Sequence, residues 1–188
     1  MLNLLNKIAS QSEPLPNPEK EIGRECHAFS ETEDKAFEII EKSTRELFQK
    51  AKISPDNYAF TKDAVGNLYI TFFGENPSKT VMCGSHADSV QNGGMYDGPA
   101  GINSAFNFLK KLLEKEQKPR FNYTIAVFRA EESSPKTGVA CLGSRIATGT
   151  ICKEELEQIS YKTDDGSLVP LKKFPERKIR TGNLGQNP

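Results

Sequence analysis

Residues 80–88 are Thr80-Val-Met-Cys-Gly-Ser-His-Ala-Asp88, a short apolar run that ends in a histidine and an aspartate. An apolar run of this length is typical of a short strand in the core of a domain. The loop that follows is rich in glycine and leads to a second aspartate, Asp97. One histidine and two aspartates therefore stand just after a strand, in a pattern that suits a metal site.

The residues after this loop complete a βαβ unit. Apolar residues recur at helical spacing between Gly101 and Leu113, and Pro119 ends that pattern. Residues 122–129 are apolar on both faces, as expected for a central strand with helices on both sides of its sheet. The two strands of such a unit run parallel. We therefore expect an α/β fold with a mixed, mainly parallel sheet flanked by helices.

Weaker patterns predict the remaining elements. Ser30 and Glu33 form a capping box at the start of a one-sided apolar stripe that ends at Ala51, which predicts a helix. Further elements are expected as strands at 57–61 and 68–73, a turn at 74–79, and helices within 138–150 and 154–159.

Length and composition indicate one domain with polar ends. A chain of 188 residues suits one domain, and an apolar fraction of 36% is low enough to suggest polar tails. Residues 11–28 contain three prolines and are expected to be irregular, and few apolar residues follow Lys172. We divide the chain into an N-terminal extension (1–29), one α/β domain (30–172) and a loose tail (173–188).

Charge and cysteine content exclude several classes of protein. Lys and Arg (25) balance Asp and Glu (25), so no basic surface is expected and nucleic acid is not a partner. The N-terminus lacks the apolar run of a signal peptide, and no membrane span is expected. The four cysteines form no C-x-x-C pair, and Cys83 and Cys141 lie in segments expected to be buried. We expect reduced thiols and a cytoplasmic protein.

The ends of the two parallel strands should bring several ligand types together. The carboxyl ends of parallel strands lie at one edge of a sheet, so His86 should meet the adjacent Glu131 and Glu132 there. Imidazole and carboxylate suit zinc or manganese, and Asp97 is placed to bridge two ions. Asp88 can accept the other N–H of the imidazole. One glutamate can bind metal while its neighbour takes a proton from water.

Each of these residues alone has a simpler explanation. A single histidine after a strand is usually a satisfied loop residue, an Asp-Gly pair is usually a turn, and adjacent glutamates usually begin a solvated helix. Their combination at two parallel strand ends favours a metal site. His27, the only other histidine, is expected on the surface.

Several ordered motifs carry a resemblance to a known family. They are Asp63-Ala-Val-Gly-Asn67, Gly84-Ser-His-Ala-Asp88, Asn92-Gly-Gly-Met-Tyr-Asp-Gly98, Ala130-Glu-Glu132 and Gly143-Ser-Arg145. Through them the chain resembles the dinuclear-zinc aminoacylase and carboxypeptidase superfamily, within its N-carbamoyl-L-amino acid amidohydrolase and allantoate amidohydrolase branch. The resemblance covers residues 30–150 and implies a zinc-peptidase-like catalytic domain.

The resemblance also implies a reaction and a set of roles. His86 and Glu132 look like metal ligands, Asp97 the bridging ligand, Glu131 the general base and Asp88 the carboxylate that orients the histidine. The resemblance implies two divalent ions, zinc with manganese as the alternative. It also implies a small-molecule substrate and hydrolysis of a C–N bond in an amide or ureido group.

The chain also departs from the family pattern. Family members take two further ligand histidines from downstream segments and carry an inserted lid domain, whereas this chain has no histidine after His86. Residues 30–172 are therefore expected to form a truncated, partial metallohydrolase domain without the lid. Because the sheet would lack neighbouring strands, we expect an exposed edge and self-association.

Three functions remain open from the sequence. The first is an amidohydrolase that works with a complementing C-terminal chain. The second is a non-catalytic metal-binding or interaction domain of the same family. The third is a small-molecule-binding α/β domain whose strand ends hold a ligand without metal.

Overall fold

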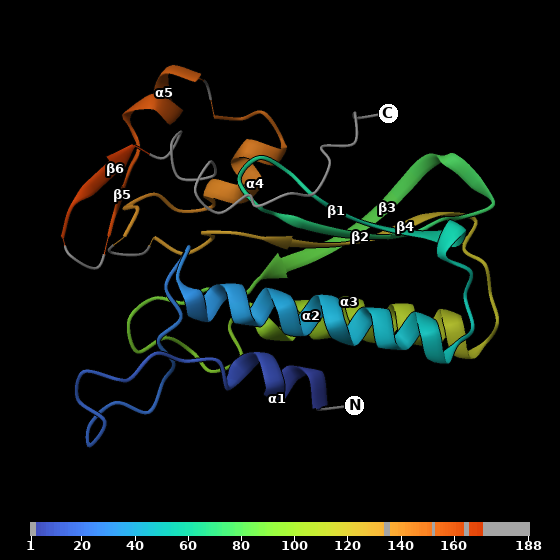
Figure 1. Ribbon diagram of the computed structural model, residues 1–188, viewed down its shortest axis with the longest axis horizontal. Coiled ribbons are helices and arrows are strands. Elements are labelled where there is room, and N and C mark those ends of the chain that lie inside the picture. The colour runs from blue at the N-terminus through green and yellow to red at the C-terminus, as the bar shows by residue number, and fades with distance from the viewer. Residues whose placement is uncertain (1–2, 134–135, 152, 164–165, 171–188) are drawn as a thin grey trace.

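The computed structural model describes residues 3–133, 136–151, 153–163 and 166–170. The elements, shown in Figure 1, are in order α1 (Asn3–Ala9), α2 (Glu31–Lys50), the 3-10 helix η1 (Pro55–Asn57), β1 (Tyr58–Lys62), β2 (Leu68–Phe72), β3 (Asn76–His86), α3 (Pro99–Glu114), β4 (Phe121–Phe128), α4 (Leu142–Ala147), α5 (Lys153–Gln158), β5 (Ser160–Lys162) and β6 (Leu168–Pro170). No described helix is both long and apolar enough to cross a membrane.

The main sheet has four strands in the order β1-β2-β4-β3. Strands β3 and β4 are parallel and joined by α3, which confirms the predicted βαβ unit. The other two pairings, β1 with β2 and β2 with β4, are antiparallel. The expectation of a mainly parallel sheet is therefore wrong. Residues 63–67 are too few for a crossover connection, so the strands that they join, β1 and β2, must be antiparallel. Strand β2 then pairs with the edge of β4 that β3 leaves free.

Helices lie on both sides of this sheet, but unequally. Helices α1, α2 and α3 cover one face, whereas α4 and α5 lie on the other side (Figure 1). The core between the sheet and the three helices includes Ile40 and Phe48 of α2, Ile70 of β2, Leu109 of α3 and Ile125 of β4. The capping box at the start of α2 is confirmed, because Ser30 Oγ accepts from Glu33 N at 3.1 Å.

Helix α1 adds apolar side chains that the sequence patterns did not single out. Leu4 and Ile8 are buried in the same core, and α1 contacts both α2 and α3. Residues 11–28 contain no helix or extended strand, as expected for an irregular segment, but several of their side chains are buried. The predicted tail, residues 173–188, lies outside the described residues.

The turn between β1 and β2 ties the strand ends to α4. Asp63 Oδ1 accepts from the backbone of Val65 and Asn67, at 3.2 and 2.9 Å. The Asn67 side chain then donates to Gly143 O at 2.9 Å and accepts from Arg129 N at 2.8 Å. These bonds fix the point at which β4 ends, immediately before the two glutamates.

Strand β3 forms an edge of the sheet and is more exposed than its sequence suggests. Val81 and Met82 are 50% and 52% exposed. The expected exposed edge is present, and self-association stays a prediction. Cys83 is exposed and Cys141 half-buried, so the expectation of two buried cysteines is wrong. Cys83 lies on β3, which has a neighbouring strand on one side only, and Cys141 lies outside the sheet at the start of α4. The described cysteines are free thiols, and Cys152 lies outside the described residues.

Candidate metal centre

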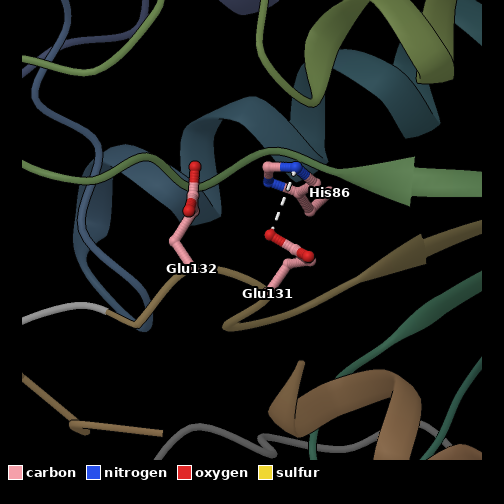
Figure 2. Close-up of side chains that lie close together, drawn as sticks. All are labelled: His86, Glu131 and Glu132. Carbon is pink, nitrogen blue, oxygen red and sulfur yellow. Dashed lines mark ion pairs between the residues drawn. The ribbon is translucent and has the colours of Figure 1, made fainter. Parts of the chain in front are cut away.

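His86, Glu131 and Glu132 converge where the parallel strands end. His86 is the last residue of β3 and pairs with Phe128, the last residue of β4. The glutamates follow shortly after, and one ligand atom from each of the three residues lies within 4.8 Å of the others. Figure 2 shows Glu131 and His86 pointing toward one another, with His86 Nε2 3.5 Å from Glu131 Oε2. The predicted meeting of these side chains is confirmed.

Asp97 reaches the same nitrogen from the glycine-rich loop. Its Oδ1 lies 3.7 Å from His86 Nε2, and its side chain is 64% exposed. Asp97 is not part of the compact group of three. It therefore lies beside the cluster, open to solvent, rather than inside it.

Asp88 connects the loop after β3 to the glutamates after β4. Its side chain is fully buried, and Oδ1 lies 3.4 Å from His86 Nδ1. The same carboxylate accepts from the backbone N–H groups of Glu131 and Glu132, at 3.2 and 3.0 Å. The sequence predicted the contact with the imidazole but not these two amide bonds. Asp88 thus holds the ring and the glutamate backbone in one arrangement.

Negative charge dominates the cluster. Burial opposes protonation of His86, but Asp88, Glu131 and Glu132 outweigh it and raise the pKa of its imidazole. Burial also raises the pKa of Glu132; His86 opposes this shift, but Asp97, Glu131 and Asp88 add to it. Four carboxylates around one imidazole repel each other unless a cation is present. A histidine nitrogen with carboxylate oxygens is a donor set that fits zinc or manganese.

Cys141 is a further side chain in contact with the cluster. Its thiol donates to Glu131 Oε1 at 3.4 Å, and this bond, with burial, raises the pKa of Cys141. The backbone N–H of Cys141 also donates to Glu131 O. The sequence singled out Gly143-Ser-Arg145 but gave no signal for this cysteine, because its contact depends on how the chain passes the cluster before it enters α4.

The two histidines are in different settings. His27, predicted to lie on the surface, has a side chain only 13% exposed, and its Nε2 lies 2.8 Å from Glu25 Oε1. That prediction is wrong, because residues 23–28 pack against the loop after β3 instead of extending into solvent. Among the described residues, His27 belongs to no group of three metal ligands.

Gly98 leaves the space that the His86 ring occupies. Its φ is +78°, and a Cβ atom built there would lie 2.8 Å from both Cε1 and Nδ1 of His86. We expect Gly98→Ala to weaken Mn²⁺ binding by about 10-fold or more, because the ring must move. Gly149→Ala is the control, since Gly149 has a φ of +67° but nothing within 4 Å of the added atom.

Gly149→Ala should lose about 1–2 kcal/mol of unfolding free energy from left-handed strain, and Gly98→Ala more, because its Cβ would also lie 2.4 Å from His86 O. Isothermal titration calorimetry with Mn²⁺ separates them. Equal affinities for the two variants would show that Gly98 does not constrain the ring.

The chain matches a known protein family. The model of peptidase family M28 matches residues 67–161, the range that contains His86, Asp97 and both glutamates. A ureidoglycolate hydrolase from Arabidopsis thaliana is 27% identical over 89% of this chain and 35% of its own length. An N-carbamoyl-L-amino acid amidohydrolase from Geobacillus stearothermophilus is 36% identical over 51% of this chain and 24% of its own.

Solved structures share the fold. A hydantoinase/carbamoylase family amidase from Burkholderia ambifaria superposes with a TM-score of 0.70 at 20% identity, over 93% of this chain and 39% of that one. The structure of AtUAH in complex with glyoxylate gives 0.70 at 23% identity, over 92% and 38%. The chain therefore spans little more than a third of the length of these relatives.

Proposed function

The chain belongs to peptidase family M28, and from this premise we propose that it is a metal-dependent amidohydrolase domain that acts on a C–N bond. The observation that carries the proposal is the convergence of His86, Glu131 and Glu132 at two parallel strand ends. The matched region contains all three residues, and its relatives include C–N hydrolases.

We assign the binding roles from the donor set. His86, Glu132 and the solvent-exposed Asp97 would hold the divalent cation, zinc or manganese, with Asp97 as the bridge where two ions bind. Asp88 lies on the far side of the His86 ring, with its backbone O 3.2 Å and its Oδ1 3.4 Å from Nδ1, and this keeps Nε2 turned toward the other carboxylates. A divalent ion there supplies Lewis acidity toward a carbonyl oxygen and toward water.

Glu131 is the proposed general base. Its side chain is 36% exposed, so water can reach it, and the Cys141 thiol holds Oε1 while Oε2 faces His86 Nε2. A carboxylate in this setting can take a proton from water and return it to the leaving nitrogen. Its neighbour Glu132, joined to Asp88 through its own backbone, is left free to act as a ligand.

The proposed substrate class is a small ureido or amide compound of the N-carbamoyl amino acid or allantoate type. The curated relatives include ureidoglycolate hydrolase, N-carbamoyl-L-amino acid amidohydrolase and allantoate amidohydrolase. Crystals of AtUAH contain glyoxylate or (S)-hydroxyglycine. The names of these enzymes refer to small polar compounds that contain a C–N bond, and we propose a substrate of the same class for this chain.

We further propose that a complementing segment completes the site in the cytoplasm. The family resemblance assigns two more ligand histidines to downstream segments, and this chain has none after His86. A second candidate function follows from the same observation: a metal-binding domain of the family without turnover of its own.

A hydrolysis assay distinguishes the two candidates. The chelator-treated chain is supplied with Mn²⁺ or Zn²⁺ and offered N-carbamoyl-L-amino acids, allantoate and ureidoglycolate. The assay is run with the chain alone and with the chain mixed with the downstream segment of the Geobacillus stearothermophilus relative. We expect metal-dependent turnover, reduced by about 10²–10⁴-fold in Glu131→Gln because proton transfer is lost.

Glu154→Gln is the matched control, since Glu154 is an exposed glutamate on α5 outside the cluster. Turnover that survives Glu131→Gln would refute the role of that residue. Metal binding without turnover, alone and with the added segment, would favour the non-catalytic candidate.

A further inference from the structure

Residues 23–27, here called the strap, run alongside the loop that follows β3. Arg24 N donates to Gly93 O at 3.0 Å, and Gly93 N donates back to Arg24 O at 2.9 Å. Closer to the cluster, Ser89 N donates to Cys26 O at 2.8 Å and Cys26 N donates to Ser89 Oγ at 2.9 Å. The strap is thus paired with the loop at two separate points.

Side chains strengthen this pairing at its outer end. Gly23 N donates to Asn92 Oδ1 at 2.8 Å, and Asn92 N donates to Glu25 Oε2 at 3.2 Å. The other oxygen of Glu25 lies 2.8 Å from His27 Nε2. A Cβ atom at Gly23 would lie 2.5 Å from backbone atoms of Asn92 and Gly93, so glycine permits the close approach.

Arg24 extends from the strap to the centre of the His-Ala-Asp segment. Its side chain is fully buried, and Nη2 donates to Ala87 O at 2.7 Å. Ala87 stands between His86, which faces the glutamates, and Asp88, which holds the His86 ring. A bond to this carbonyl fixes the Ala87–Asp88 peptide, from which the Asp88 side chain projects and which lies one residue beyond His86.

Stability alone gives a poor account of Arg24. Nη2 also donates to Gln11 O, at a longer 3.4 Å, whereas Nε and Nη1 have no hydrogen-bond partner among the described residues. A buried guanidinium with partners for only part of its donors carries a desolvation penalty. An apolar side chain of similar length would avoid that penalty, so the arginine is better explained by what Nη2 holds.

We propose that Arg24 is a positioning residue for the metal centre, acting through Ala87 O on the orientation of His86 and Asp88. The inference rests on the proposed function, because it concerns the same cluster. It gives the strap a role in the site, although the segment lies more than sixty residues before the cluster in sequence. Outer residues that orient metal ligands typically contribute 10–100-fold to affinity.

Two measurements test the proposal without turnover. The chain has only two histidines, so the imidazole ¹⁵N signals of His86 can be followed by NMR in the metal-free protein. Mn²⁺ affinity is measured by calorimetry, because manganese prefers oxygen and imidazole to thiols. We expect Arg24→Met to shift the His86 signals and weaken Mn²⁺ binding about 10-fold or more. Arg24→Lys should lie between Arg24→Met and the unmodified chain.

Ile8→Val is the control for general destabilisation, since Ile8 is buried in α1 and should change neither measurement. The proposal would be overturned if Arg24→Met left the His86 signals unshifted and the Mn²⁺ affinity within about twofold of that of the unmodified chain. If Arg24→Met does not fold, unchanged values in Arg24→Lys overturn it equally. A chain that binds Mn²⁺ but hydrolyses nothing contradicts the proposed function and leaves this test intact.

Discussion

Replacing Arg129 with leucine is expected to lower the free energy of unfolding by about 3–5 kcal/mol at pH 8. Arg129 is buried beyond the end of β4, and its Nη1 lies 2.5 Å from Glu33 Oε2 while Nη2 lies 2.7 Å from Asp34 Oδ1. Its guanidinium also lies 4.3 Å from the ring centroid of Phe37. Removing it leaves the fully buried Glu33 without its cation, which is the costly way to break a buried pair.

The loss should depend on pH through Glu33. Burial raises the pKa of Glu33 from 4.5 to about 7 although Arg129 opposes the shift. Without Arg129 that pKa rises further. A carboxyl whose pKa is higher in the folded state destabilises the fold increasingly as pH rises from its unfolded pKa to its folded one. The difference between variant and unmodified chain should therefore grow above pH 7 and be smallest at pH 6 and below.

Urea denaturation at pH 6, 7 and 8.5 measures this dependence. Arg45→Leu is the control, because Arg45 forms a surface pair with Glu41 and should cost no more than about 1 kcal/mol. A loss for Arg129→Leu that is below 1 kcal/mol, or that does not change with pH, would show that Glu33 does not depend on Arg129.

Replacing His86 with alanine is expected to weaken Mn²⁺ binding by at least about 100-fold. His86 Nε2 is the atom on which Asp97 and Glu131 converge, at 3.7 and 3.5 Å, and no other described histidine belongs to the cluster. The carboxylates that remain would hold a divalent ion only loosely, because the nitrogen ligand between them is lost. Calorimetry with Mn²⁺ measures the loss directly.

His27→Ala is the matched control for this variant. The side chains of His27 and His86 are similarly buried, at 13% and 9% exposed, and each lies near a carboxylate. His27→Ala should leave Mn²⁺ affinity unchanged. Equal losses in both variants would place the ion elsewhere or attribute the effect to stability.

Local patterns predicted the elements that carry the site. The apolar run that ends at His86, the amphipathic helix after Gly101 and the apolar strand before Glu131 each have a clear period, and the βαβ rule then requires parallel strands. From this alone, His86 and the glutamates were expected at one edge. The structure confirms their meeting, and the role of each residue stays a prediction.

The sequence could not predict interactions between distant segments. Strand β2 pairs with β4 in the antiparallel direction. The hydrophobic pattern within a strand does not indicate which other strand becomes its neighbour. Arg129 meets Glu33 across 96 positions, and Arg24 meets Ala87 across 63. Asp88 was expected to face the imidazole, two residues away, but its bonds to the glutamate amides depend on the completed sheet.

The central claim is that His86, Glu131 and Glu132 form a site for a divalent cation. A crystal of the chain soaked in Zn²⁺, with anomalous scattering recorded at the zinc edge, tests it most directly. The account predicts an anomalous peak bound to His86 Nε2 and to a carboxylate oxygen of Glu132 or Asp97. A fully soaked crystal with no peak at His86, or with zinc bound only at the exposed Cys83, would contradict it.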